Sequence, residues 1–299
     1  MIPFPETELR MNNDNMKKVL LALLSSLAFL PVQAGKIVTD SLYSRTLKET
    51  VVFNVYLPDG FEKSKASYPV IYLLHGLSDN YTAWEKRGRM QTVTDELVRS
   101  GEIVPTVVIM PNAGGPDVHN TWNGYFNMPG WNYEDFFFGE LLPAVEKKYR
   151  CGGSKGKRAV MGLSMGGGGS VVYAQRHPDM FSSCYAMSAW LDNKNDELKR
   201  TVDEIDKLYY VREAVKEHSA LDFLDNADDA TIKKLKTVAW FVDCGDDDFL
   251  LHLNYEFHMK MKKAGVHSEL RVRNGVHNWE YWHLALRLSL PFASRNFDR

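Results

Sequence analysis

The 299-residue sequence lacks most of the features that mark specialised classes of protein. Its three cysteines, Cys151, Cys184 and Cys244, are too few and too widely spaced for a metal-binding cluster, and they allow one disulfide bond at most. The net charge is -2, so no basic field indicates binding to nucleic acid. No internal repeat is visible. With 44% hydrophobic residues the chain is expected to be globular, and we expect neither a metal nor a cofactor.

The sequence also lacks an apolar run long enough to span a membrane. The run at residues 19–30 has 12 residues, whereas a spanning helix needs about 20. Two lysines precede this run and a small residue, Ala34, follows it, which is the pattern of a secretory signal peptide. We therefore expect residues 1–34 to be removed. The mature chain, 35–299, would then be secreted or periplasmic and would have no membrane span.

The most informative stretch is Gly-Leu-Ser-Met-Gly at residues 162–166. An apolar run precedes it and a helical pattern follows it, so the chain is expected to turn sharply from a strand into a helix. Ser164 would occupy the strained turn, and Gly162 and Gly166 would provide the clearance. An ordinary glycine-rich turn is the alternative, but the flanking strand and helix favour a nucleophilic serine. The first N–H groups of the helix would then face an oxyanion.

Apolar runs alternate with helical patterns along the rest of the chain, which predicts an α/β fold. Such a series implies a mostly parallel central sheet with helices on both faces. Asn132 is expected to cap one helix, whose apolar positions reach Tyr149. Strands are expected at 50–58, 68–74, 104–110, 183–187, 236–242 and 268–272, and further helices at 91–100, 250–264 and 279–293.

Two segments interrupt this alternation. Residues 190–234 are polar, charged and helix-forming, so we expect a helical cap inserted over the site. Residues 112–131 form a loop after a strand, a position where α/β proteins bind ligands. An ordinary surface loop with aromatic anchors is the alternative. The loop contains four large aromatic residues, Trp122, Tyr125, Phe126 and Trp131, of which we expect Trp122, Tyr125 and Trp131 to bind substrate.

A serine hydroxyl becomes a good nucleophile only when a base takes its proton and a carboxylate orients that base. His277 follows the last strand, and three consecutive acids follow the strand before it. Among the acids we favour Asp248, with Asp247 as the alternative, and we expect Asp243 to lie within the strand. A solvated or calcium-binding acidic loop is a further reading, but neither accounts for the histidine.

Four motifs, at residues 73–80, 162–167, 244–249 and 275–282, together resemble the esterase D and feruloyl esterase group of α/β-hydrolases. The resemblance implies the α/β-hydrolase fold, with Ser164 as nucleophile, Asp248 as acid and His277 as base. It also implies an oxyanion hole formed by the amides of Leu77 and Met165, and a structural role for His75. The uninterrupted glycines at 166–169 depart from this pattern, and we expect them to mark close packing.

These inferences predict a serine carboxylic ester hydrolase that acts through an acyl-enzyme. Its substrates would be small esters or acylated oligosaccharides, with acetyl or feruloyl groups on plant polysaccharide fragments as the main expectation. The alternatives are an acyltransferase of the mycolyltransferase type and a thioesterase similar to S-formylglutathione hydrolase. A binding module without catalysis is less well supported, because the serine, acid and histidine are all present and occur in the order of the α/β-hydrolase fold. The sequence does not indicate an oligomeric state.

Overall fold

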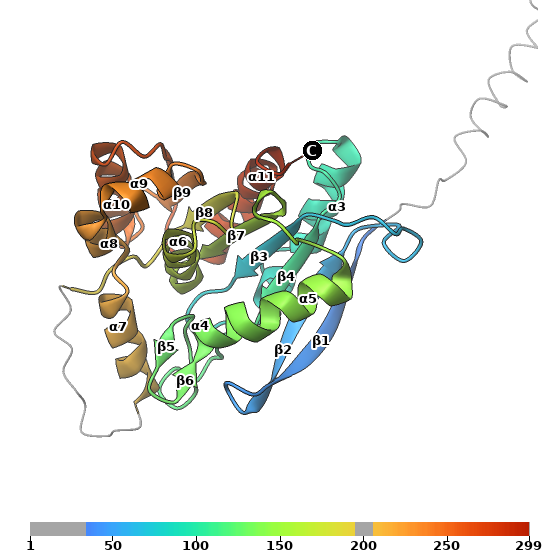
Figure 1. Ribbon diagram of the computed structural model, residues 1–299, viewed down its shortest axis with the longest axis horizontal. Coiled ribbons are helices and arrows are strands. Elements are labelled where there is room, and N and C mark those ends of the chain that lie inside the picture. The colour runs from blue at the N-terminus through green and yellow to red at the C-terminus, as the bar shows by residue number, and fades with distance from the viewer. Residues whose placement is uncertain (1–33, 195–205, 299) are drawn as a thin grey trace, which may run out of the picture. The chain divides into compact units, whose positions relative to one another are not determined.

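The structure, a computed structural model, describes residues 34–194 and 206–298, so the predicted signal peptide lies outside the described residues except for Ala34. From Gly35 onward the described chain is organised on a central sheet of eight strands (Figure 1). Across the sheet the strands follow in the order β1 (Lys36–Ser44), β2 (Glu49–Leu57), β4 (Val107–Pro111), β3 (Val70–Leu74), β7 (Arg158–Leu163), β8 (Ser183–Met187), β9 (Ala239–Gly245) and β10 (Glu269–Arg273).

The strands from β4 to β10 are parallel, whereas β2 and β1 are antiparallel additions at one edge. This confirms the predicted mostly parallel sheet. In the parallel register Leu74 lies opposite Gly162, and Met187 lies opposite Asp243. The carboxyl ends of β3, β7, β8 and β9 therefore share one edge of the sheet, and the loops that follow these strands open at the same place.

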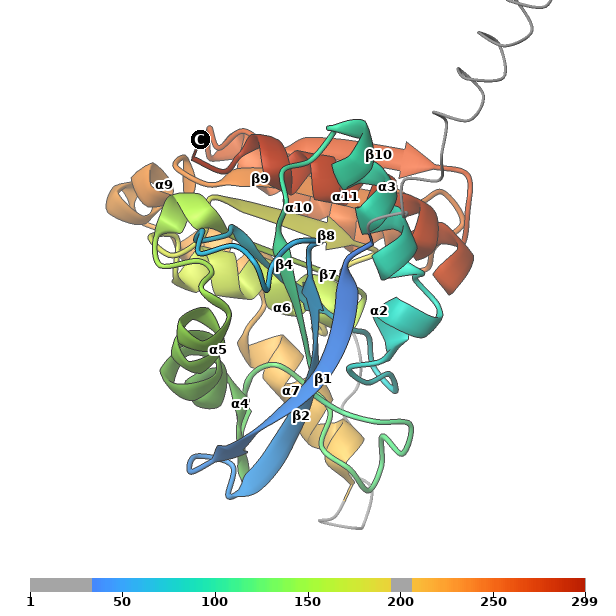
Figure 2. The same cartoon turned by 90° about the vertical axis from the view of Figure 1, so that its right-hand side faces the viewer.

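Strand β1 is absent from the sequence-based prediction, which began the sheet at residue 50. Most of its side chains are exposed or half-buried, and only Ser44 is buried. An edge strand of this kind needs no continuous apolar run, because it has only one paired side and packs lightly on the core. Figure 2 shows β1 beside β2, extending the sheet away from the parallel strands.

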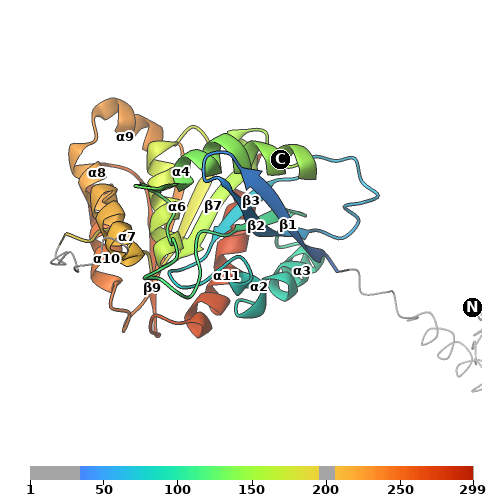
Figure 3. The same cartoon turned by 90° about the horizontal axis from the view of Figure 1, so that it is seen from below.

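Helices cover both faces of the sheet, as predicted. Successive residues of β3 alternate between the faces: Ile71 and Leu73 join one hydrophobic cluster, and Tyr72 and Leu74 join the other. The first face is covered by α2 (Ala83–Lys86), α3 (Met90–Ser100) and α11 (Trp279–Arg295). The second is covered by α4 (Tyr133–Phe136), α5 (Leu142–Tyr149), α6 (Met165–Arg176) and α10 (Leu251–Lys263). Figure 3 shows α4 and α6 on one side of the sheet and α11 on the other.

Among the described residues between β8 and β9, where the sequence predicted a helical insertion, there are three helices. They are α7 (Lys207–Glu217), α8 (Ala220–Asn226) and α9 (Asp229–Leu235). Each begins after a side chain that accepts a backbone N–H of the first turn: Asp206, Ser219 and Asp228. Such caps satisfy N–H groups that the helix itself leaves unpaired, so these three starts are specified locally.

The helix expected after Asn132 differs in detail from the prediction. Asn132 occupies the position before α4, but its side chain makes no capping hydrogen bond. The helix widens into a π-helical turn, η1 (Phe137–Leu141), before it continues as α5. Two short elements flank this region, the hairpin of β5 (Asn127–Met128) with β6 (Trp131–Asn132) and the single turn η2 (Lys155–Lys157).

All three cysteines are free and buried, so the one disulfide that the count allows is not formed. Burial raises the pKa of each thiol, to about 12 for Cys244. These cysteines therefore behave as small hydrophobic residues of the core.

Candidate active site

The turn between β7 and α6 has the strained geometry that its sequence predicts. Ser164 has φ 51° and ψ -118°, a backbone conformation that residues other than glycine rarely adopt. A Cβ atom on Gly162 would lie 2.5 Å from the carbonyl oxygen of Gly166, and one on Gly166 would lie 2.5 Å from that of His75. Neither position has room for a side chain. The glycines allow β7, α6 and the end of β3 to meet beneath Ser164.

The remaining glycines of the run also mark close packing. A Cβ atom on Gly167 would approach Ala189 to 3.0 Å, and one on Gly168 would lie 2.0 Å from the carbonyl oxygen of Trp190. On Gly169 it would press against the ring of Tyr125 at 3.0 Å. The first turn of α6 is therefore enclosed by backbone and an aromatic ring, which outweighs the low helix propensity of glycine.

Three side chains from different loops form a hydrogen-bonded chain at the carboxyl edge of the sheet. Nε2 of His277 lies 2.9 Å from Oγ of Ser164, and Nδ1 of His277 lies 2.9 and 3.0 Å from the two carboxylate oxygens of Asp248. The two other acids that the sequence brought into consideration do not join this chain. Asp247 is exposed, and Asp243 lies inside β9, where it accepts hydrogen bonds from Tyr185 and Arg273.

The surroundings of Asp248 keep its carboxylate ionised. Burial alone raises the pKa of this group, but hydrogen bonds from His277, the amide of Leu250 and the hydroxyl of Ser188 outweigh burial and hold the pKa below its usual range. Ser188 is itself buried at φ 46°, and its hydroxyl accepts from the indole N–H of Trp282 at 3.0 Å. A residue that the sequence analysis did not select therefore orients the acid.

His75 is buried beneath the loop that leads to Leu77. Its Nε2 accepts the N–H of Ala113 at 2.9 Å, so the ring is neutral and its Nδ1–H donates to the carbonyl oxygen of Gly76. The phenol of Tyr125 donates to the carbonyl oxygen of His75 at 3.0 Å. These contacts make His75 a support for the loop after β3. His75 does not take part in the hydrogen bonds that connect Ser164, His277 and Asp248.

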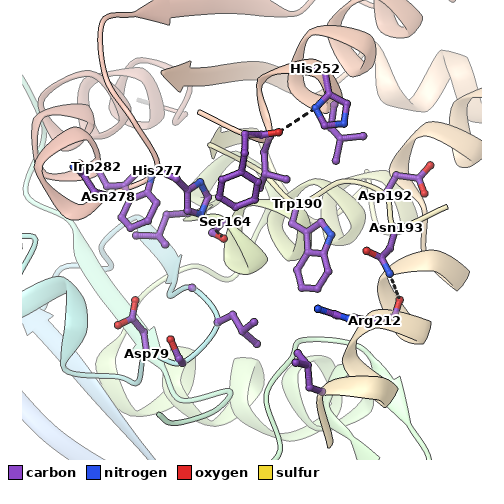
Figure 4. A pocket seen from close by; sticks show the side chains of 18 of the residues that line it. Asp79, Ser164, Trp190, Asp192, Asn193, Arg212, His252, His277, Asn278 and Trp282 are labelled. Atoms are coloured by element: carbon purple, nitrogen blue, oxygen red, sulfur yellow. Dashed lines mark hydrogen bonds between the residues drawn. The ribbon is translucent and has the colours of Figure 1, made fainter. Parts of the chain in front are cut away.

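The site opens into a pocket of about 1010 Å³ (Figure 4). Ser164 and His277 line it together with Leu77, the residue expected to supply an oxyanion-hole amide. The opposite wall includes Trp190 and Arg212, which Figure 4 shows next to each other. Apolar contributions come from Leu208, Leu221, Phe249, Leu250 and Leu253.

Comparison with known proteins assigns the family. Residues 44–293 match the model of the family described as putative esterase. The chain belongs to this esterase family. It shares 48% identity with a solved structure of a ferulic acid esterase, with a TM-score of 0.85, over 89% of this chain and 99% of the other.

Other proteins with similar sequences differ from this chain in length and in name. The chain is 26% identical over 260 residues to an endo-1,4-beta-xylanase/feruloyl esterase of Xylanibacter ruminicola. That match covers 85% of this chain and 31% of the other protein, so the chain spans about a third of that relative's length. It is also 30% identical over 140 residues to a diacylglycerol acyltransferase/mycolyltransferase of Mycobacterium gordonae, which is 44% of this chain and 38% of that protein.

The aromatic residues of the loop at 112–131 do not line the pocket, although Trp122, Tyr125 and Trp131 were expected to bind substrate. Tyr125, Phe126 and Trp131 are buried, and neither they nor Trp122 line the pocket. Trp122 stacks on Trp131 and contacts Tyr210, while Nζ of Lys207 lies 3.8 Å above its ring. The correction has a physical cause, because the apolar faces of these rings are covered by one another and by α7. The loop supports α7.

Trp190 and Arg212 were not singled out individually from the sequence, although both line the pocket. Trp190 follows the carboxyl end of β8, so the rule that ligands bind beyond such ends would have identified it. Arg212 lies in the charged segment that forms α7, where it resembles any solvated cation, and no pattern in the sequence distinguishes it.

Proposed function

We propose that this protein is a serine carboxylic ester hydrolase in which Ser164 is the nucleophile, His277 the base and Asp248 the acid. The observation that carries the proposal is the hydrogen-bonded chain from Asp248 through His277 to Ser164 at the floor of a pocket. Membership of the esterase family supports it.

The reaction follows from these positions. Oγ of Ser164 attacks the ester carbonyl carbon while Nε2 of His277 takes the hydroxyl proton, and Asp248 stabilises the resulting imidazolium. When the tetrahedral intermediate collapses, the bond to the alcohol oxygen breaks and His277 returns the proton to the departing alcohol. Water then attacks the acyl-enzyme by the same two steps, and it releases the acid and regenerates Ser164.

The amides of Leu77 and Met165 are proposed to hold the oxyanion. Met165 is the first residue of α6, a position whose N–H has no acceptor within the helix. Leu77 lines the pocket in the loop after β3, next to Gly76, where an added Cβ would lie 3.6 Å from Cβ of Ser164. Two preorganised donors of this kind stabilise developing negative charge by several kcal/mol, roughly 3–4 for a single donor in measured cases.

We propose acetyl or feruloyl esters of plant polysaccharide fragments as substrates. The similarity to a ferulic acid esterase and to a xylanase/feruloyl esterase supports this choice, and the apolar pocket walls suit an acyl chain or an aromatic ring. The resemblance to the mycolyltransferase favours acyl transfer as a second candidate, in which another alcohol replaces water.

Export to the periplasm or the medium is part of the proposal. The described residues contain no helix that has both the length and the apolar character to cross a membrane. Intact-mass analysis of the protein recovered from an exporting bacterium should show a chain that begins near Gly35. Recovery of the full-length chain in the cytoplasm would contradict export.

A substrate panel with wild-type protein and the Ser164→Ala variant tests the activity. We expect wild type to hydrolyse acetyl, butyryl and feruloyl esters, and the variant to lose up to roughly a million-fold in turnover. A fluorophosphonate should label wild type at the peptide containing Ser164 and leave the variant unlabelled. Adding an alcohol acceptor separates hydrolysis from transfer, and S-formylglutathione tests the thioesterase alternative. Normal hydrolysis by Ser164→Ala would disprove the mechanism.

A further inference from the structure

The pocket wall contains several cations, and they differ in how they are neutralised. Arg87 pairs with Asp79 at 2.9 Å, and Lys194 pairs with Asp222. Arg212 has no carboxylate partner among residues 34–194 and 206–298, although it lines the same pocket. Within the described chain its guanidinium is therefore the uncompensated positive charge of the wall.

The acids of the pocket are already engaged. Asp79 is paired with Arg87, and Glu256 lies 3.6 Å from Lys260. The carboxylate of Asp192 accepts the hydroxyl of Ser219 at 2.7 Å and the amide of Lys194 at 2.8 Å. Because these acids have partners of their own, none of them neutralises Arg212, whose guanidinium carries five N–H donors and lines the cavity.

Arg212 is an exposed residue of α7 that lines the pocket. Val211, Ala214 and Val215 bury one side of α7, and Arg212 is not among these buried residues. Figure 4 shows its side chain extending toward Trp190, and Nδ2 of Asn193 contacts its carbonyl oxygen at 3.5 Å.

The start of α7 is also tied to the loop that contains Trp122. The amide of Lys207 donates to the carbonyl oxygen of His119 at 2.8 Å, and the ammonium group of Lys207 lies over the ring of Trp122. The helix that bears Arg212 is thus fixed at its start relative to this loop.

The wall is also tied to the nucleophile. The amide of Trp190 donates to the carbonyl oxygen of Ser164 at 3.0 Å, and the amide of Ala220 in α8 donates to that of Leu191 at 2.9 Å. Trp190 is half-buried, so part of its indole is available to an apolar portion of a ligand. The indole of Trp190 is therefore positioned relative to Ser164, and Figure 4 shows the guanidinium of Arg212 beside it.

We propose that Arg212 selects esters that carry a carboxylate. A guanidinium binds a carboxylate through two parallel hydrogen bonds. The carboxylate could belong to the acyl group, as in a half-ester of a dicarboxylic acid, or to a uronic acid in the sugar. This inference rests on the proposed function, because it presupposes ester cleavage at Ser164.

Matched pairs of substrates separate the two sources. On the acyl side, mono(4-nitrophenyl) succinate is compared with 4-nitrophenyl butyrate. On the sugar side, a feruloyl ester of methyl glucuronide is compared with the same ester of methyl glucoside. For each pair, kcat/KM of the charged substrate is divided by kcat/KM of the neutral substrate. In one of the two pairs, this ratio should be about tenfold or more higher for wild type than for Arg212→Gln. The preference should weaken as salt is added.

Lys216→Gln is the control, since Lys216 is an exposed cation on the same helix and does not line the pocket. It should keep the wild-type ratios in both arms. Equal ratios for wild type and Arg212→Gln in both arms would overturn the inference. Binding of succinate and methyl glucuronide to Ser164→Ala, with and without Arg212→Gln, measures the preference without turnover. A wild type that cleaves no ester would therefore contradict the proposed function, while unchanged binding would contradict the role of Arg212.

Discussion

The amide of Trp190 donates a hydrogen bond to the carbonyl oxygen of Ser164 at 3.0 Å. This contact joins the loop after β8 to the strained turn after β7. Directly below it, Gly168 leaves no space, since a Cβ atom there would lie 2.0 Å from the carbonyl oxygen of Trp190. The pocket wall and the nucleophile are therefore positioned by one set of backbone contacts.

The first prediction concerns Gly168→Ala. The added methyl group can be accommodated only if the backbone of Trp190 moves, so we expect a loss of about 1–3 kcal/mol in the free energy of unfolding and a lower kcat/KM. Gly139→Ala is the matched control, because no heavy atom lies within 4 Å of a Cβ placed there. It should be neutral or stabilising by up to about 1 kcal/mol. Urea denaturation and ester hydrolysis measure both variants, and equal behaviour would refute the packing argument.

The second prediction separates the neighbouring acids. Asp248→Asn should lower kcat by about 10³- to 10⁴-fold, because the amide cannot stabilise the imidazolium and favours the wrong tautomer of His277. Asp247→Asn changes an exposed side chain, so its effect should stay within about twofold. Steady-state kinetics with one acetyl ester decide the matter. A large effect of Asp247→Asn with a small effect of Asp248→Asn would reverse the assignment.

The third prediction tests Ser188 as a positioning residue. Its hydroxyl contacts Asp248, and its φ of 46° is a conformation that glycine adopts more easily than alanine. Ser188→Ala and Ser188→Gly should both lower kcat by about tenfold with little change in KM, since both remove the hydroxyl. Ser188→Gly should be the more stable of the two by about 1 kcal/mol. Full kcat in Ser188→Gly would show that the backbone conformation matters and the hydroxyl does not.

The fourth prediction concerns pH and His75. Burial lowers the pKa of this histidine to about 4, and the hydrogen bond to Gly76 only partly opposes burial. The unfolded chain would bind a proton near pH 6.5, while the native chain would not do so until about pH 4. The contribution to stability is therefore present above pH 6.5 and lost as the pH falls toward 4, with a total on the order of 3 kcal/mol.

Urea unfolding of wild type and His75→Gln from pH 8 to pH 4.5 measures this contribution. Glutamine offers a neutral acceptor for the amide of Ala113 and does not titrate in this range. The stability of wild type relative to the variant should fall as the solution is acidified below pH 6.5. Parallel curves would contradict a buried neutral histidine.

Much of this arrangement follows from local sequence. The central strands are continuous apolar runs, and the turn at Ser164 needs Gly162 and Gly166 for reasons of space alone. Ser164, Asp248 and His277 follow β7, β9 and β10, whose carboxyl ends lie along one edge of the parallel sheet. Geometry that depends on one short segment, or on carboxyl ends of parallel strands that share an edge, was therefore predictable.

What depends on distant contacts was not predictable. The sequence around Trp122 and Trp131 would look the same whether these rings bind a ligand or support α7. Only the positions of Lys207 and Tyr210 in the structure show that the rings are covered. Arg212 stands out because no carboxylate of the described residues pairs with it, and a single sequence does not show which charges are paired. Ser188 is a small residue after a strand, and its importance comes from its contacts with Trp282 and Asp248.

The three buried thiols give the molecule an internal reporter of its own unfolding. A thiolate reacts with alkylating reagents and a protonated buried thiol does not, so the native protein should stay unmodified while an opened chain is labelled. Cys151 lies just after α5, Cys184 in β8 and Cys244 in β9, which spreads the three sites over different parts of the core. The order in which they become reactive would therefore reveal whether the sheet and its flanking helices open together or one after another.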